Sequence, residues 1–131
     1  MKRILIVDDN KYLLDGLTIQ LREKLRNCRV LTAENGLKAL KMLEAEPIDL
    51  LLIELRMAGM DGYELMERAQ LCCPRVQVYV MTSAVCPSFE QRALLLGARQ
   101  CITKPLSFAK IVQFIAQELN AAIDPIGVPA Y

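Results

Sequence analysis

The chain alternates between short apolar runs and longer stretches in which apolar residues recur every three or four positions. Residues 3–7 (RILIV) form such a run, which is typical of a strand buried on both faces of a parallel sheet. Asn10 then suits a helix cap, and leucines recur at helical spacing from Leu14 to Leu25, with polar residues on the opposite face. This segment therefore predicts a strand followed by an amphipathic helix that packs on a sheet.

The same alternation repeats along the rest of the chain. Further strands are predicted at residues 29–33, 49–53, 76–81 and 99–102. A helix is predicted after the cap at Asn35, with Leu37, Leu40 and Leu43 facing inward, and another over residues 64–71. A further helix is predicted from the apolar stripe Phe89, Ala93 and Leu96. The last helix follows the cap at Ser107, and its inward residues are Phe108, Ile111, Val112, Ile115 and Leu119.

Five strands alternating with five helices indicate an α/β fold, a five-stranded parallel sheet in a (βα)5 three-layer sandwich. The flavodoxin-like strand order 2-1-3-4-5 suits five strands best. A length of 131 residues suits one domain. We expect this domain over residues 1–122 and a tail or linker over 123–131, because the last eight residues (DPIGVPAY) contain two prolines and a glycine.

Composition narrows the classes of function. The charged side chains, 16 basic and 15 acidic, give a net charge of +1, which argues against direct binding of nucleic acid through bulk positive charge. The chain has no histidine, which excludes histidine-dependent triads and imidazole metal sites. Five cysteines without CxxC spacing favour reduced thiols in a cytoplasmic protein, and the apolar runs are too short to span a membrane. The cysteines are Cys28, Cys72, Cys73, Cys86 and Cys101.

Polar residues stand where the predicted strands end. They are Asp8, Asp9, Glu54, Thr82, Ser83 and Lys104. The carboxyl ends of parallel strands meet at one edge of the sheet, which is where ligands bind in such folds. Taken alone, Asp8 and Asp9 are also explained as caps of the first helix.

The whole set is harder to explain by capping. Neighbouring carboxylates raise each other's pKa unless a cation neutralises them. Lys104 supplies one positive charge, and carboxylate and carbonyl oxygens are ligands that Mg²⁺ prefers. A hydrated Mg²⁺ ion, a hydroxyl and a lysine together are suited to handling a phosphoryl group.

Five motifs lie at or next to the predicted strands: residues 6–9 (IVDD), 49–62 (DLLLIELRMAGMDG), 81–83 (MTS), 97–98 (GA) and 103–105 (TKP). With these motifs the chain resembles the receiver domain of bacterial two-component response regulators, up to about Leu119. The resemblance implies that Asp8, Asp9 and the main-chain carbonyl of Arg56 bind Mg²⁺. It also implies that Thr82 and Lys104 bind the phosphoryl group, and that the peptide bond before Pro105 is cis.

The chain departs from the family at the phosphoacceptor, where Glu54 replaces the expected aspartate. The extra methylene moves the carboxylate by about 1.5 Å. In-line transfer loses on the order of 10²-fold in rate for a displacement of about 1 Å, so Glu54 is expected to be a poor phosphoacceptor. Three alternatives stay open: partial mimicry of the phosphorylated state or a fixed state, simple loss of phosphorylation with the fold retained, and residual phosphorylation. Mimicry requires that Glu54 reach toward Lys104 and Thr82, whereas a Glu54 that ligates the metal or pairs with Lys104 can also leave the domain inactive.

Other positions bear on signalling and partners. The aromatic switch residue of the family falls at Cys101, which is too small to exchange between buried and exposed positions. Leu94 and Phe114 lie off the predicted inward stripes and are candidates for a partner surface. Expected partners are a histidine kinase or phosphotransfer protein and an output target, with the chain a monomer or weak homodimer.

The sequence thus predicts an atypical, non-enzymatic receiver that acts by protein–protein interaction, with Mg²⁺ binding weakened or absent if Glu54 pairs with Lys104. The alternative within signalling is a receiver that a histidine kinase still phosphorylates. The alternatives from another class are a flavodoxin-like cofactor binder or a phosphatase. The loop after the first strand, residues 9–13 (DNKYL), lacks the Gly-rich or Ser/Thr-rich character that phosphate binding by such a cofactor site requires.

Overall fold

A computed structural model describes residues 1–83, 87–104 and 107–120 of the chain. The strands are β1 (Lys2–Val7), β2 (Cys28–Ala33), β3 (Leu50–Glu54), β4 (Gln77–Thr82) and β5 (Gln100–Thr103). The helices are α1 (Lys11–Lys24), α2 (Gly36–Ala45), α3 (Gly62–Cys72), α4 (Pro87–Leu95) and α5 (Phe108–Leu119). All strand pairs are parallel and the order is β2-β1-β3-β4-β5, which confirms the predicted fold class and strand order.

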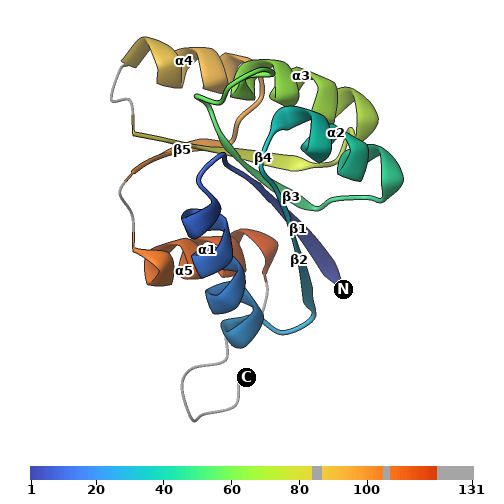
Figure 1. The fold of residues 1–131 in the computed structure, drawn as a ribbon, viewed down its shortest axis with the longest axis vertical. Coiled ribbons are helices and arrows are strands. Elements are labelled where there is room, and N and C mark those ends of the chain that lie inside the picture. Colours follow the sequence, from blue (N-terminus) through green and yellow to red (C-terminus); the bar gives the residue numbers. More distant parts are fainter. Residues whose placement is uncertain (84–86, 105–106, 121–131) are drawn as a thin grey trace.

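Helices cover both faces of the sheet (Figure 1). The apolar core has two parts because successive strand residues point to opposite faces. On β1, Leu5 and Val7 belong to the part under α2, α3 and α4, whereas Ile4 and Ile6 belong to the part under α1 and α5. This burial on both faces explains why the strands read as continuous apolar runs.

Three predicted helix caps are confirmed. The side chain of Asn10 accepts hydrogen bonds from the first turn of α1, that of Asn35 from Lys38, and that of Ser107 from Lys110. Caps of this kind satisfy backbone N–H groups that have no partner within the helix. The sequence therefore located the starts of α1, α2 and α5 closely.

Helix α3 begins at Gly62, two residues before its predicted start. The side chain of Asp61 caps it by accepting a hydrogen bond of 2.9 Å from the backbone N–H of Glu64. The Gly62 N–H donates to the carbonyl oxygen of Leu55, and a Cβ at Gly62 would lie only 2.7 Å from the Cα of Leu55. The missing side chain of Gly62 thus lets α3 approach the end of β3.

The predicted inward stripes need two corrections. Leu37 is 63% exposed, because α2 turns Gly36, Ala39 and Leu43 toward the core instead. On α4, Ala93 is fully buried, but Phe89 is 36% exposed at the start of the helix. On a short helix with many apolar residues, the sequence does not decide which residues face the sheet. Neighbouring positions lie about 100° apart around the helix axis, and either row of residues fits the helical spacing.

Candidate functional site

The predicted site residues lie at the carboxyl edge of the sheet. Asp8 follows β1, Glu54 and Thr82 are the last residues of β3 and β4, and Lys104 directly follows β5. Parallel pairing places Val7 opposite Ile53, one residue before Glu54, so these strands end together. The sequence had placed Glu54 and Thr82 just after their strands; they are instead held within the sheet.

Lys104 joins the two buried carboxylates of this edge. Its Nζ lies 2.5 Å from Oδ2 of Asp8 and 3.4 Å from Oε1 of Glu54. Asp8 is fully buried and Glu54 nearly so, while the Lys104 side chain is 17% exposed. One ammonium group thus contacts two carboxylates that water barely reaches and offsets one of their two negative charges. The predicted convergence of these three side chains is present in the structure.

The Glu54 carboxylate is held at both oxygens. Oε1 accepts a hydrogen bond from Lys104, and Oε2 accepts one of 3.0 Å from the backbone N–H of Leu55. Burial raises the pKa of Glu54 above the usual glutamate value; Lys104 opposes this rise, and the negative charge of Asp8 adds to it. Glu54 is therefore a confined carboxylate whose charge depends on Lys104.

Thr82 is buried beside these groups, with the predicted neighbour Ser83 exposed. The backbone N–H of Lys104 donates a hydrogen bond of 2.9 Å to the carbonyl oxygen of Thr82. This bond fixes the chain after β5 against the end of β4. The same contact therefore positions Thr82 and the Lys104 side chain at one end of the sheet.

The expected Mg²⁺ ligands are Asp8, Asp9 and the main-chain carbonyl of Arg56. Both oxygens of Asp8 already accept hydrogen bonds, Oδ1 from the backbone N–H of Asn10 at 2.9 Å and Oδ2 from Lys104. Asp9 and Arg56 are exposed. Over residues 1–83, 87–104 and 107–120, no three acidic or cysteine side chains are grouped so that they hold a metal ion. A Mg²⁺ ion bound by Asp8 would therefore have to share or displace these hydrogen bonds. The ligand roles of Asp8, Asp9 and the Arg56 carbonyl stay predictions.

The positions expected to serve signalling are placed as follows. Cys101 is half-buried with Sγ 4.0 Å from the carbonyl oxygen of Glu90 in α4, and burial raises the pKa of its thiol. Leu94 is 43% exposed, as expected. Pro105, with its predicted cis peptide bond, lies outside the described residues, as do Cys86 and the predicted tail 123–131.

Phe114 is not the open apolar residue that its place off the inward stripe suggested. It is half-buried, and its ring meets the ring of Tyr79 edge-on with centroids 4.8 Å apart. Tyr79 in turn donates a hydrogen bond of 2.7 Å from its hydroxyl to Glu118. The Tyr79 ring of β4 thus packs against Phe114 of α5. The spacing of apolar residues along the helix does not predict this contact.

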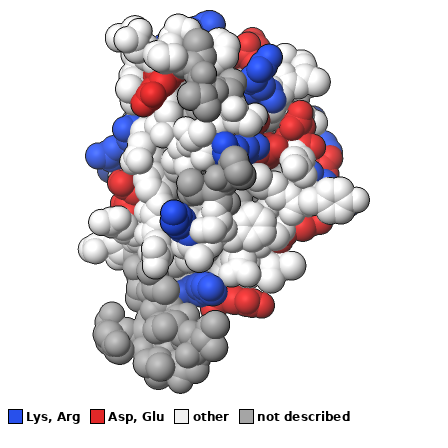
Figure 2. All heavy atoms as spheres, turned by 90° about the vertical axis from the view of Figure 1, so that its left-hand side faces the viewer, with Lys and Arg blue, Asp and Glu red and all other residues white. Residues whose placement is uncertain are grey.

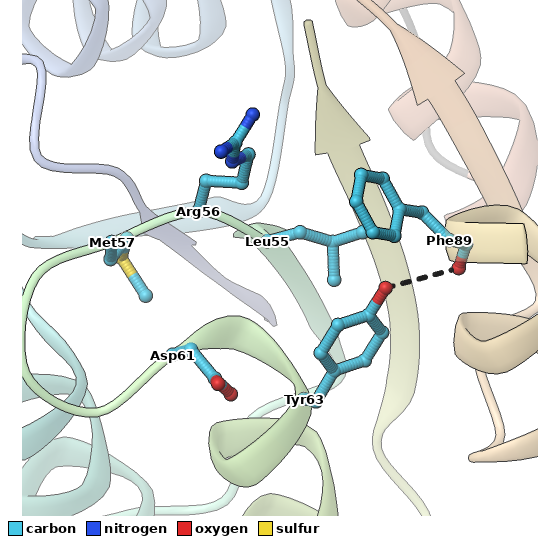
Figure 3. A pocket seen from close by; sticks show the side chains of 6 residues that line it. All are labelled: Leu55, Arg56, Met57, Asp61, Tyr63 and Phe89. Atoms are coloured by element: carbon cyan, nitrogen blue, oxygen red, sulfur yellow. Dashed lines mark hydrogen bonds between the residues drawn. The ribbon is translucent and has the colours of Figure 1, made fainter. Parts of the chain in front are cut away.

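A pocket of about 410 Å³ opens next to the Glu54 end of β3. It is lined by Leu55, Arg56, Met57, Asp61, Tyr63 and Phe89 (Figure 3). Sequence reasoning missed it, because its described lining residues come from the loop after β3, from α3 and from α4. The only hint in the sequence is a tyrosine in the first turn of the helix that follows the Glu54 loop.

The charged groups on the face toward α4, β5 and α5 are scattered among uncharged ones (Figure 2). No continuous patch of one sign is visible among the described residues of this face. This distribution agrees with the net charge of +1. In the described part of the chain, none of the helices has the length and apolar character that a membrane crossing needs.

Comparison with known proteins identifies the family of the chain. The family model described as the response regulator receiver domain matches residues 4–116. The chain is 36% identical over 118 residues to transcriptional regulatory protein ZraR of Klebsiella oxytoca, over 88% of this chain and 26% of that protein. It is 32% identical over 112 residues to sporulation initiation phosphotransferase F of Bacillus subtilis, over 84% of this chain and 87% of that protein.

Among solved structures, the chain is similar to a CheY-like response regulator receiver domain protein from Methanospirillum hungatei. The two superpose with a TM-score of 0.84 at 28% identity, over 92% of this chain and 94% of the other. The chain spans about a quarter of the length of ZraR but most of the phosphotransferase and of this structure. The similarity therefore concerns the domain described here.

Proposed function

Because the chain belongs to the family of response regulator receiver domains, we propose that it is an atypical receiver in two-component or phosphorelay signalling that acts by binding protein partners. Receiver domains are signalling modules that interact with histidine kinases and phosphotransfer proteins. The observation that supports an atypical mode is the contact of Lys104 with both Asp8 and Glu54. A carboxylate fixed in this way has little freedom to accept a phosphoryl group.

The chemistry of Glu54 supports this proposal. A phosphoacceptor needs an oxygen that is free to attack in line, whereas both Glu54 oxygens accept hydrogen bonds from the domain itself. In addition, an attack by Glu54 requires that Lys104 release it, which leaves two buried carboxylates less well neutralised. Glu54 therefore serves as a permanent partner of Lys104 in this proposal, and phosphorylation does not control the domain.

Cation binding follows from the same contact. Lys104 already takes one oxygen of Asp8 and one of Glu54 and offsets one of their two charges, so we propose that Mg²⁺ binds weakly or not at all at Asp8, Asp9 and the Arg56 carbonyl. The chain then functions as a binding module, without an enzymatic reaction of its own. We further propose residues 1–122 as the domain and 123–131 as a tail or linker, in a cytoplasmic protein that is a monomer or weak homodimer.

The surface for a partner is proposed on α4. Leu94 and Leu95 are 43% and 88% exposed there. Phe114 of α5, the other predicted partner residue, is half-buried against Tyr79. Exposed apolar side chains that sit together favour protein contacts over contacts with nucleic acid, and the adjoining face carries no strong charge of one sign in its described part (Figure 2). The output target is thus proposed to be a protein.

Intact mass after incubation with Mg²⁺ and acetyl phosphate tests the proposal. The chain is expected to gain no phosphoryl group, whereas the Glu54→Asp variant, with the shorter side chain, is expected to gain one. The matched control is Glu64→Asp, which makes the same change on the exposed side of α3. A stable phosphoryl group on Glu54 of the parent chain would support the alternative, a receiver phosphorylated by a histidine kinase.

A further inference from the structure

The pocket beside β3 has the size and composition of a small-molecule site. Its volume of about 410 Å³ lies within the range of about 300–1,000 Å³ that ligand pockets occupy. Leu55 and Met57 provide a buried apolar floor, and the aromatic rings of Tyr63 and Phe89 stand beside it (Figure 3). Such a pocket suits a ligand with a flat apolar ring.

The aromatic wall is fixed in place before any ligand binds. The Tyr63 hydroxyl donates a hydrogen bond of 3.3 Å to the carbonyl oxygen of Phe89, and the Arg92 guanidinium lies 4.0 Å from the centre of the Tyr63 ring. These two contacts link α3 to the first turns of α4. A ligand therefore meets a formed wall and does not have to order it, which lowers the cost of binding.

The two charged residues at the pocket differ in direction. Figure 3 shows the Arg56 side chain extending away from Tyr63, whereas Asp61 and Met57 lie on the same side of the loop as Tyr63. Oδ1 of Asp61 accepts the capping hydrogen bond from Glu64, and Oδ2 accepts none from the described residues. The polar group of this pocket that is free to bind a ligand is thus a carboxylate oxygen.

We propose that this pocket binds a small arylalkylamine, whose ring contacts Tyr63 and Met57 and whose ammonium group donates a hydrogen bond to Asp61. The negative carboxylate selects a positively charged donor, and the apolar floor selects the ring. The pocket adjoins the Lys104 contact through Leu55, but none of Asp8, Glu54 and Lys104 is among its described lining residues. The proposal therefore does not depend on whether Glu54 accepts a phosphoryl group.

Titration of the ¹⁵N-labelled full chain with tyramine tests the site. Amide resonances of residues 55–63 and 87–92 are expected to shift at millimolar tyramine. para-Cresol, which has the ring without the ammonium group, is expected to bind the same segments about fivefold more weakly, as is typical for the loss of one charge-assisted hydrogen bond. Asp61→Asn, which keeps an oxygen to cap α3, is expected to remove that preference for tyramine.

The control variant is Glu64→Gln, which removes a negative charge three residues from Asp61 without touching the pocket lining; tyramine binding is expected to stay within twofold of the parent, about 0.4 kcal/mol. The proposal is overturned if para-hydroxyphenylacetate binds more tightly than tyramine. It is likewise overturned if tyramine shifts no resonance in the two segments, or if Asp61→Asn retains the full preference. The comparison of the three probes on the parent chain stands even if the variant does not fold.

Discussion

The ammonium group of Lys104 lies 2.5 Å from the carboxylate of Asp8, although 96 positions separate the two residues in the chain. The contact exists because β1 and β5 both end at the carboxyl edge of a parallel sheet, with β3 and β4 between them. Glu54 ends β3 and takes the second place at the same ammonium group. The fold thus assembles the site from strand ends, and the site depends on one lysine.

Replacing Lys104 by methionine is expected to destabilise the domain strongly. Asp8 and Glu54 then face each other without a neutralising cation, and breaking a buried pair from one side costs about 3 kcal/mol. Urea unfolding without divalent cations measures the loss. Because protonation removes the repulsion, the deficit of the variant should shrink as the pH falls toward about 4.

Two further variants test whether the unpaired carboxylates cause the loss of stability in Lys104→Met. In the Glu54→Gln/Lys104→Met double variant the loss should be smaller than in Lys104→Met, since one buried charge is gone. Lys110→Met on the exposed side of α5 should change the free energy of unfolding by less than about 0.5 kcal/mol. Equal losses in the single and double variants would show that Glu54 does not share the charge of Lys104.

The hydroxyl of Tyr79 should make stability depend on alkaline pH. Burial, with the hydrogen bond to Glu118, raises the pKa of Tyr79 to about 12, whereas in the unfolded chain it ionises near 10.0. The folded state therefore keeps the proton longer. This contribution to stability is fully present below pH 10 and is lost as the pH rises toward 12.

Tyr79→Phe measures that contribution. At neutral pH the variant should lose about 1 kcal/mol of unfolding free energy for the missing hydrogen bond. The difference from the parent should then fall between pH 10 and 12. Tyr12→Phe, at a position that is 89% exposed, is the control and should show neither effect. A difference that stays constant across this range would contradict the account of Tyr79.

The hydroxyl of Tyr63 should hold the start of α4. Tyr63→Phe keeps the ring under Arg92 but removes the donor to the carbonyl oxygen of Phe89. We expect faster hydrogen exchange of the α4 amides, by about fivefold for a hydrogen bond worth about 1 kcal/mol, with exchange in α5 unchanged. Uniformly faster exchange in both helices would instead indicate a loss of global stability.

Gly62 should tolerate no side chain. A Cβ there would lie 2.7 Å from the Cα of Leu55 and 2.8 Å from the carbonyl oxygen of Glu54, both backbone atoms that cannot move aside cheaply. Gly62→Ala is expected to cost about 1–3 kcal/mol, the usual cost of overpacking. Gly59→Asn is the control, because its position has no atom within 4 Å and its φ of +78° suits asparagine. An unchanged free energy of unfolding in Gly62→Ala would mean that α3 does not pack closely against the end of β3.

The sequence predicted the parts of the molecule that depend on local pattern and strand order. Continuous apolar runs such as residues 3–7 identified the buried strands, and Asn10, Asn35 and Ser107 identified helix starts. The convergence of Asp8, Glu54 and Lys104 followed from the rule that parallel strands end at one edge.

The remaining features depend on side-chain packing between distant segments. Leu37 of α2 is exposed although it was predicted to face the core, and Phe114 packs against Tyr79. The local sequence pattern predicts neither feature. The pocket at Tyr63 arises where two helices and a loop meet. In the same way, the sequence left open whether Glu54 pairs with Lys104, because that depends on where a flexible side chain comes to lie.

The amide spectrum of the chain with Mg²⁺, recorded before and after addition of acetyl phosphate, is the most direct test of a receiver that works without phosphorylation. The resonances of Thr82, Lys104 and their neighbours should stay in place, while those of Glu54→Asp should move when the same phosphodonor is added. Movement of the parent resonances to the positions of the phosphorylated variant would contradict the central claim, since Glu54 would then be a working phosphoacceptor.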